Sequence, residues 1–167
     1  MLRNYIDEDH SFCMNILDSN TPRYFASQDR EAFHAFLAVP SRTYSVLEDH
    51  EGVIVGCGGI STRKQGHEGI LTWGMIHATQ QRQGWGCILT LARLSQLSKI
   101  SSVKTITLNT SQETVGFYEK LGFRIAAFTP DYYSIGLHRY DMEIEVNEQL
   151  HQWILAALQH QKSALLT

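Results

Sequence analysis

The passage from residue 69 to residue 108 restricts the possible folds of this chain more than any other segment. Residues 69–77 have the apolar and β-branched pattern of a strand, residues 84–99 carry apolar side chains at helical spacing, and residues 103–108 form a second strand-like run. A helix that joins two strands in this way usually serves as a crossover between parallel neighbours. We therefore expect one parallel strand pair, with the other strands arranged around it.

The segment before this passage begins with a short strand and two helices. A short strand is expected at 2–6, followed by a first helix that Asp7 or Asp9 can cap and a second helix at 28–39 that Ser27 can cap. The apolar residues expected to face inward on the two helices are Phe12, Ile16, Leu17, Phe33, Phe36 and Leu37.

Strand patterns follow these helices. The runs 43–48 and 53–60 precede the strand at 69–77, with polar turns or loops between them, which predicts an antiparallel meander. The glycines at 56, 58 and 59 indicate a strand that another surface approaches closely. They do not indicate a dinucleotide loop, because no helix pattern follows them.

The segment after the passage is expected to complete the sheet. It contains a short helix at 112–121, a strand at 123–128, a loop at 129–138 and a last strand at 139–146. Residues 147–167 then predict an amphipathic helix whose cap and apolar positions are Asn147, Leu150, Trp153, Ile154, Ala157, Leu158 and Leu165. This helix can pack on its own domain or form the contact of a homodimer, and the sequence leaves both alternatives open.

Composition and charge argue against several classes of function. The net charge is −3 and the Lys and Arg residues are scattered, which is not typical of a nucleic-acid-binding surface. The chain has no long uncharged apolar run and no signal-peptide pattern, so we expect a cytoplasmic protein that does not bind membranes. Cys13, Cys57 and Cys87 are expected to be reduced, buried thiols, and no metal site is expected from the spacing of His and Cys.

The loop between the strand at 69–77 and the helix at 84–99 has the chemistry of an anion site. The first backbone N–H groups of a helix have no partner within the helix and lie at its positive end. Gly84 and Gly86 let the backbone of such a loop approach a phosphate closely and adopt positive φ angles. Because glycines also occur in ordinary turns, this loop alone does not identify a function.

Two motifs of the chain resemble those of the GNAT acetyltransferase superfamily. Gln81-x-x-Gly84-x-Gly86 is similar to the family's Gln/Arg-x-x-Gly-x-Gly/Ala signature, and the segment from Phe117 to Phe123 is similar to its Phe-Tyr-x-Lys-x-Gly-Phe run. The resemblance implies the GNAT fold, which is an α/β (α+β) fold. This fold has a mixed, mostly antiparallel sheet of about seven strands and helices on both faces, to which this chain would add a C-terminal helix.

The resemblance also implies that acetyl-coenzyme A is bound as the co-substrate. In this family the two parallel strands part, and pantetheine lies between them against exposed backbone. The N–H of Ile76 would then stabilise the oxyanion that forms when an amine attacks the thioester. The residues implied in coenzyme binding are Met75, Ile76, His77, Gln81, Arg82, Gln83, Gly84, Trp85, Gly86, Cys87, Asn109, Ser111 and Tyr118.

The second motif implies a catalytic residue. Tyr118 matches the family tyrosine near the coenzyme sulfur, where its hydroxyl would protonate the departing thiolate. Seven residues earlier the family commonly has an Asn that contacts the coenzyme, whereas this chain has Ser111, so Asn109 or Ser111 would have to replace that contact. Thr110 and Glu113 also fit a capping box, which would give Thr110 and Ser111 a structural role instead.

The general base is not decided by the sequence. An alkylammonium has a pKa of about 10.4, so an acceptor amine must lose a proton before it attacks. The candidate bases are Glu68, His77, Tyr132, Tyr133 and His138. The loop at 129–138 can form a wall of the acceptor site, since functional residues concentrate on loops, or it can be an ordinary hairpin connection.

Together these features predict a GNAT acetyltransferase domain at 1–146 and an added helix at 147–167. The expected activity is transfer of an acetyl group from acetyl-CoA to a primary amine of a small molecule or peptide, by direct attack in a ternary complex. The alternative is a non-catalytic acyl-CoA-binding or sensor module on the same fold.

Overall fold

One mixed sheet organises the protein. The computed structural model describes residues 1–39 and 43–164, with side chains described through residue 160. The sheet order is β1-β2-β3-β4-β5-β7-β6, and every neighbouring pair is antiparallel except β4 with β5. The strands are β1 (Leu2–Asn4), β2 (Thr43–Glu48), β3 (Ile54–Arg63), β4 (Glu68–Ile76), β5 (Thr105–Thr110), β6 (Arg124–Ser134) and β7 (Leu137–Glu145). The expected single parallel pair within a mostly antiparallel sheet is thus confirmed.

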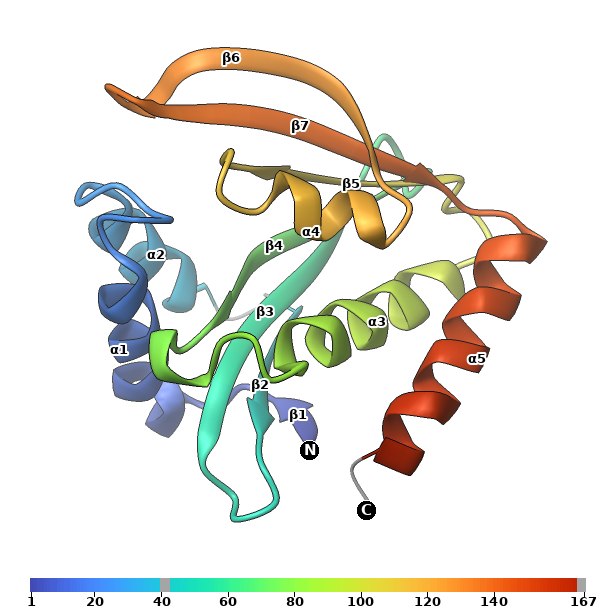
Figure 1. Ribbon diagram of the computed structural model, residues 1–167, viewed down its shortest axis with the longest axis horizontal. Helices are drawn as coiled ribbons and strands as arrows, with labels where there is room; N and C mark the ends of the chain where they lie inside the picture. The colour runs from blue at the N-terminus through green and yellow to red at the C-terminus, as the bar shows by residue number, and fades with distance from the viewer. Residues whose placement is uncertain (40–42, 165–167) are drawn as a thin grey trace.

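Helices cover both faces of the sheet. On one face α1 (His10–Asn20) and α2 (Asp29–Leu37) build a core around Phe33, and on the other α3 (Trp85–Ser98) and α5 (Glu148–Ala164) build a second core (Figure 1). The shorter elements are η1 (Asp7–Asp9), η2 (Ala78–Gln80) and α4 (Val115–Lys120). Within the described part of the chain, no helix combines the length and the apolar character needed to cross a bilayer.

The ladder between β4 and β5 is short. It pairs residues 68–70 with residues 105–107, after which β4 continues to Ile76 without pairing to β5. A bulge lies opposite β3 in this second half of β4, where Trp73 has a φ of 43°. The last residues of β4 are therefore bonded to β3 on one edge and not paired with a strand on the other.

A buried arginine supports the bulge from the side of α3. Arg93 is 2% exposed, and its Nε donates to the carbonyl of Leu89. A Cβ added at Gly58 or Gly74 would lie 2.9 Å or 2.5 Å from the guanidinium, so only glycine leaves room for it on both strands. The expected close approach of another surface to the glycines of β3 is confirmed at Gly58.

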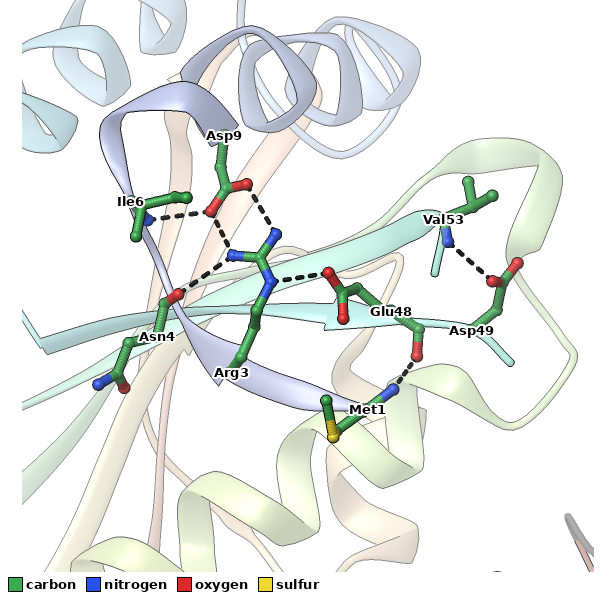
Figure 2. A network of polar contacts seen from close by, with 8 residues as sticks. All are labelled: Met1, Arg3, Asn4, Ile6, Asp9, Glu48, Asp49 and Val53. Atoms are coloured by element: carbon green, nitrogen blue, oxygen red, sulfur yellow. Dashed lines mark hydrogen bonds and ion pairs between the residues drawn. The ribbon is translucent and has the colours of Figure 1, made fainter. Parts of the chain in front are cut away.

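The start of α1 is fixed by an ion-pair network. The guanidinium of Arg3 lies between two carboxylates, with Nη1 2.7 Å from Asp9 Oδ2 and Nε 2.7 Å from Glu48 Oε1 (Figure 2). The hydrogen bond from Arg3 holds the pKa of Asp9 below its usual range, and the backbone N–H of Ile6 donates to the same carboxylate. These contacts join β1 and β2 to the helix that carries Asn20 toward the end of β4.

Four details differ from the sequence-based expectation. Phe12 is 57% exposed, because it lies outside the buried face of α1, which consists of Cys13, Met14, Ile16, Leu17 and Asn20. Asp9 is the N-cap of α1 as expected, but its side chain makes no cap bond to α1, because the carboxylate binds Arg3 and accepts the N–H of Ile6 at the start of η1. Ser27 does not cap α2, whose N-cap is Gln28.

The other two differences concern the second motif and the last hairpin. The capping box of Thr110 and Glu113 is absent, because α4 begins only after Thr114 and Glu113 pairs with Arg23. Most of the segment 129–138, expected to be a loop, is strand, because β6 continues to Ser134. β6 lies at the edge of the sheet, where a strand can pair irregularly with its one neighbour, as β6 does with β7 after Thr129.

The last helix packs against α3 of the same chain. Leu150 and Ile154 are buried in the core that α3 shares, and the N–H of Leu150 donates to Asn147 Oδ1 at 2.9 Å, which confirms the expected cap. His151 joins the two helices, with Nδ1 2.8 Å from the carbonyl of Asn147 and Nε2 2.8 Å from the carbonyl of Ser98. Two carbonyls can both be satisfied only by a doubly protonated ring.

This geometry predicts a pH-dependent contribution of His151 to stability. The hydrogen bonds to the carbonyls of Ser98 and Asn147 raise the pKa of His151 above its ordinary value of 6.5. The contribution is therefore complete below the unfolded-state pKa and is lost as the pH rises through the higher folded-state pKa. The melting temperature of His151→Gln should fall below that of the native protein at pH 5.5, and the difference should shrink toward pH 8.5. The same scan on the exposed His50→Gln is the control, and a His151 difference that stays constant with pH would contradict the account.

Candidate functional site

The loop before α3 presents a row of free backbone donors. Gly84 is the N-cap of α3 with a φ of 89°, and Arg82 also has a positive φ of 62°. The N–H groups of residues 82–86 donate to no acceptor in the described part of the chain, whereas those of Cys87 and Ile88 both donate to the carbonyl of Gly84. The expected donor row is therefore seen at residues 82–86, but the N–H of Cys87 is already occupied.

The two sequence motifs meet beside this loop. A Cβ added at Gly86 would lie 3.6 Å from Phe117 Cζ and 3.9 Å from Ile76 Cγ1. The first turn of α3, the end of β4 and the helix that carries Tyr118 are therefore neighbours. A Cβ added at Gly84 would meet no atom within 4 Å, which leaves this residue open to a ligand.

The backbone of Ile76, at the end of β4, does not bond to β3. The N–H of His77 donates to the carbonyl of Val55 at 2.9 Å, so the next residue inward, Ile76, directs its own N–H and C=O away from β3. The carbonyl of Ile76 accepts from Asn20 Nδ2 at 2.9 Å and from Gln81 Nε2 at 3.4 Å. The carbonyl oxygen of Ile76 is therefore occupied, whereas its N–H makes no hydrogen bond to the described residues.

The sequence alone does not predict a role for Asn20 in the site. This residue is 3% exposed, and its Oδ1 accepts from Gln81 Nε2 at 2.7 Å. Tyr24 in turn donates its hydroxyl to Gln81 Oε1 at 3.2 Å. The one sequence feature that points to a buried role for Asn20 is its place as a polar residue at the end of an otherwise apolar helical stripe. The side chain of Gln81, the first residue of the signature, is therefore directed into the protein.

Several implied coenzyme ligands have side chains engaged elsewhere. Met75 is buried in the core under α1 and α2, and the ring of His77 lies between Asn15 Oδ1 and Thr79 Oγ1, at 3.1 Å and 2.9 Å. Ser111 is 4% exposed, and Asn109 Oδ1 accepts the hydroxyl of Tyr133 at 3.3 Å. Only backbone contacts from Met75 and His77 are thus compatible with ligand binding in this arrangement.

Tyr118 lies on α4 between two aromatic rings. Its ring is 5.0 Å from that of Phe117 and 5.7 Å from that of Phe123, edge to face in both cases. No hydrogen-bond partner for its hydroxyl is found among residues 1–39 and 43–160. The ring is held by packing while the hydroxyl keeps its donor capacity.

The five candidate bases are scattered. Glu68 lies at the start of β4, at the opposite end from Ile76, and its hydrogen bond with Arg63 lowers its pKa to about 2. His138 Nδ1 accepts from the N–H of Asp131 within the last hairpin. A carboxylate of such low pKa is a poor proton acceptor at neutral pH.

The two tyrosines among the candidates lie in β6. Burial raises the pKa of Tyr133 to about 12, and the ring of Tyr132 lies 4.7 Å from the guanidinium carbon of Arg139. A phenol of raised pKa remains protonated at neutral pH and donates, here to Asn109. The ring of His77, the fifth candidate, is also hydrogen-bonded, so none of the five is favoured as the general base.

The connection between α1 and α2 contacts the segment before α4 and the edge strand β6. Arg23 Nε lies 3.0 Å from Glu113 Oε2, and Gln28 Nε2 donates to the carbonyl of Tyr133 at 2.7 Å. These contacts link α1 and α2 to the segment before α4 and to β6.

The described residues contain no cluster of three or more His, Cys, Asp or Glu side chains suited to a metal.

Comparison with known proteins decides the family. A family model described as an acetyltransferase (GNAT) domain matches residues 13–146. The chain belongs to the GNAT acetyltransferase family. Its seven-stranded mixed sheet and flanking helices are those of GNAT structures. A search of curated protein sequences finds no match.

Solved GNAT structures share the fold at low sequence identity. Ard1 from Thermoplasma volcanium has a TM-score of 0.73 and 22% identity over 89% of this chain and 98% of its own. The ribosomal-protein-S18-alanine N-acetyltransferase from Escherichia coli has a TM-score of 0.72 and 18% identity over 88% and 94%. An aminoglycoside 6′-N-acetyltransferase complexed with coenzyme A has a TM-score of 0.70 and 14% identity over 88% and 97%.

Proposed function

We propose that this protein is an acetyl-CoA-dependent N-acetyltransferase that acts on a primary amine of a small molecule or peptide. The observation that carries the proposal is the row of free N–H groups at residues 82–86, beside the end of β4. Adjacent phosphates, such as those of coenzyme A, match a row of donors at the positive end of a helix. The aminoglycoside acetyltransferase with the same fold was solved with coenzyme A, which supports this donor.

In the proposed complex, pantetheine lies along the edge of β4 that β5 leaves unpaired. The N–H of Ile76 donates to the thioester oxygen, where negative charge grows as the amine attacks. Met75 and His77 contribute through their backbone. The free N–H of Ile76 beside an occupied carbonyl supports this role, because the residue then offers a donor without a competing acceptor.

Tyr118 acts as the acid in this proposal. The neutral amine nitrogen bonds to the acetyl carbon, the carbon–sulfur bond breaks, and the hydroxyl of Tyr118 donates its proton to the thiolate sulfur. The proton that the nitrogen loses passes to solvent, and the Tyr118 phenolate takes up a proton from solvent before the next turnover. The attack is direct, within a ternary complex. Support comes from the neighbouring Phe117, whose Cζ lies 3.6 Å from where a Cβ at residue 86 would be, and from the aromatic packing of the Tyr118 ring.

Two similar structures support a primary amine of a small molecule or peptide as the acceptor. One similar structure is named for an alanine of a ribosomal protein and another for aminoglycosides, so this fold serves peptides and small molecules alike. We also propose that the transferase domain covers residues 1–146 and that residues 147–167 are an addition to it. The family match ending at residue 146 and the separate packing of α5 on α3 support that boundary.

Substitution of Gly86 tests coenzyme binding. Gly86→Asp places a carboxylate beside the proposed phosphates, whereas Gly86→Asn adds a side chain of the same size without charge. Repulsion of about 4 kcal/mol at 4 Å, for an effective dielectric constant of 20, corresponds to roughly a 1000-fold loss of affinity. Calorimetry with acetyl-CoA should show binding to the native protein and far weaker binding to the Asp than to the Asn variant, with a gap that narrows at high salt.

An acidic residue in the first turn stabilises a helix, so the Asp variant is expected to stay folded, which circular dichroism checks. Equal affinities of the two variants would contradict the placement of the phosphates. Absence of acetyl-CoA binding to the native protein at millimolar concentration would exclude the proposed function.

Substitution of Tyr118 tests catalysis. Tyr118→Phe keeps the ring and its packing but removes the proton donor, so turnover should fall about 100-fold. Affinity for acetyl-CoA should stay within about twofold of the native value, because the loss affects the leaving group only. Free thiol released across a panel of polyamines, amino acids, aminoglycosides and peptides measures the rate. An unchanged rate would refute the role of Tyr118, and binding without turnover on any amine would favour a sensor module.

A further inference from the structure

Asn20 joins three segments through one buried side chain. It is the last residue of α1 and is 3% exposed. Its Nδ2 donates to the carbonyl of Ile16 at 2.7 Å and to the carbonyl of Ile76 at 2.9 Å, and its Oδ1 accepts from Gln81 Nε2 at 2.7 Å. Both amide hydrogens and the amide oxygen of Asn20 therefore have short hydrogen bonds.

The bond to Ile76 fixes a peptide that no second strand holds. The peptide between Ile76 and His77 is bonded on one side by its N–H to Val55 and on the other by its carbonyl to Asn20. Without Asn20, the buried carbonyl of Ile76 would lose its close hydrogen-bond donor. This carbonyl lies beside the N–H of the same residue, which is assigned to the oxyanion. An acceptor left free at this point would repel the developing negative charge.

The bond to Gln81 fixes the beginning of the signature loop. Gln81 directly precedes the free donors of residues 82–86, and its side-chain amide is held on both atoms, by Asn20 and by Tyr24. The side chain thus serves as an internal anchor for the loop. Asn20 reaches both this anchor and the end of β4, which are separated by the turn η2.

We propose that Asn20 is a positioning residue that sets the N–H of Ile76 and the donor loop at residues 82–86 at a fixed spacing. Through this spacing the thioester and the phosphates of one acetyl-CoA molecule meet their donors at the same time. The inference builds on the proposed function and adds a residue of α1 to the acetyl-CoA site. Asn20 acts through Ile76 and Gln81 and does not touch the substrate.

The test compares Asn20→Leu with Asn15→Ala. Leu has a similar size but makes none of the three hydrogen bonds. Asn15 lies on the same helix and bonds to the exposed ring of His77, so its substitution controls for a general loosening of α1. Circular dichroism and thermal melting define a temperature at which all variants are folded.

Amide hydrogen exchange reads the positioning role without any ligand. In Asn20→Leu the N–H groups of His77 and Ala78 should exchange at least about tenfold faster, because the peptides at the end of β4 open more often. Asn15→Ala should stay within about twofold of the native rates. Native exchange rates in Asn20→Leu would overturn the inference. If Asn20→Leu does not fold, the milder Asn20→Ser, which loses the reach to Ile76, replaces it under the same criteria.

Kinetics read the consequence for the reaction. A misplacement of about 1 Å can cost up to about 100-fold in rate, so Asn20→Leu should lower kcat/KM by about tenfold to 100-fold. Gln81→Met removes one of the same bonds, so the double variant should lose less than the product of the two single losses. Fully multiplicative losses, or kcat/KM within about twofold of native in Asn20→Leu, would overturn the inference. If the native protein neither binds nor uses acetyl-CoA, the proposed function fails, and hydrogen exchange alone decides the role of Asn20 in positioning.

Discussion

The early end of the ladder between β4 and β5 is the constraint on which the rest of the structure depends. After three residue pairs the second half of β4 has no strand on that side, so its backbone groups need other partners. Side chains of β2, α1 and α3 supply donors: Tyr44 to the carbonyl of Trp73, Asn20 to the carbonyl of Ile76 and, at 3.5 Å, Arg93 to the carbonyl of Thr72. The carbonyls are thus satisfied from within the protein. The N–H of Ile76 is left without a hydrogen bond to the residues that the structure describes.

The same constraint explains the positions of the flanking helices. The last turn of α1 must reach the end of β4 for Asn20 to bind there, and the network of Arg3, Asp9 and Glu48 holds the other end of that helix. From the opposite face, α3 inserts Arg93 between Gly58 and Gly74 under the bulge. The buried guanidinium has no carboxylate partner among its hydrogen bonds to described residues, so its desolvation is offset only by neutral acceptors.

Much of the fold could be predicted from the sequence, because hydrophobic period and glycine placement report it directly. The parallel pair, the helix after Gly84 and the cap at Asn147 follow from local patterns that the structure confirms. The signature loop could be located because its chemistry is that of the backbone, which depends on glycine positions and a helix start. The prediction failed where a distant partner decides, as for Glu113, which pairs with Arg23 instead of forming a capping box.

The polar contacts of the site lay beyond sequence reasoning for the same reason. Asn20 and Gln81 are 61 residues apart, and nothing local to α1 reveals that its last residue meets the end of β4. Motif position alone indicates Ser111 and His77 as coenzyme ligands, whereas the burial of Ser111 and the hydrogen bonds of the His77 ring show that both side chains are engaged elsewhere.

We propose that backbone donors at the end of β4 and at the start of α3 bind one acetyl-CoA molecule. Nuclear magnetic resonance of the backbone amides during a titration with acetyl-CoA tests it most directly. The amides of Ile76, Gly84, Trp85 and Gly86 should shift together and saturate at one equivalent, while that of His77, bonded to Val55, shifts less. Saturable shifts confined to another part of the protein, or no shifts at millimolar acetyl-CoA, would contradict the account.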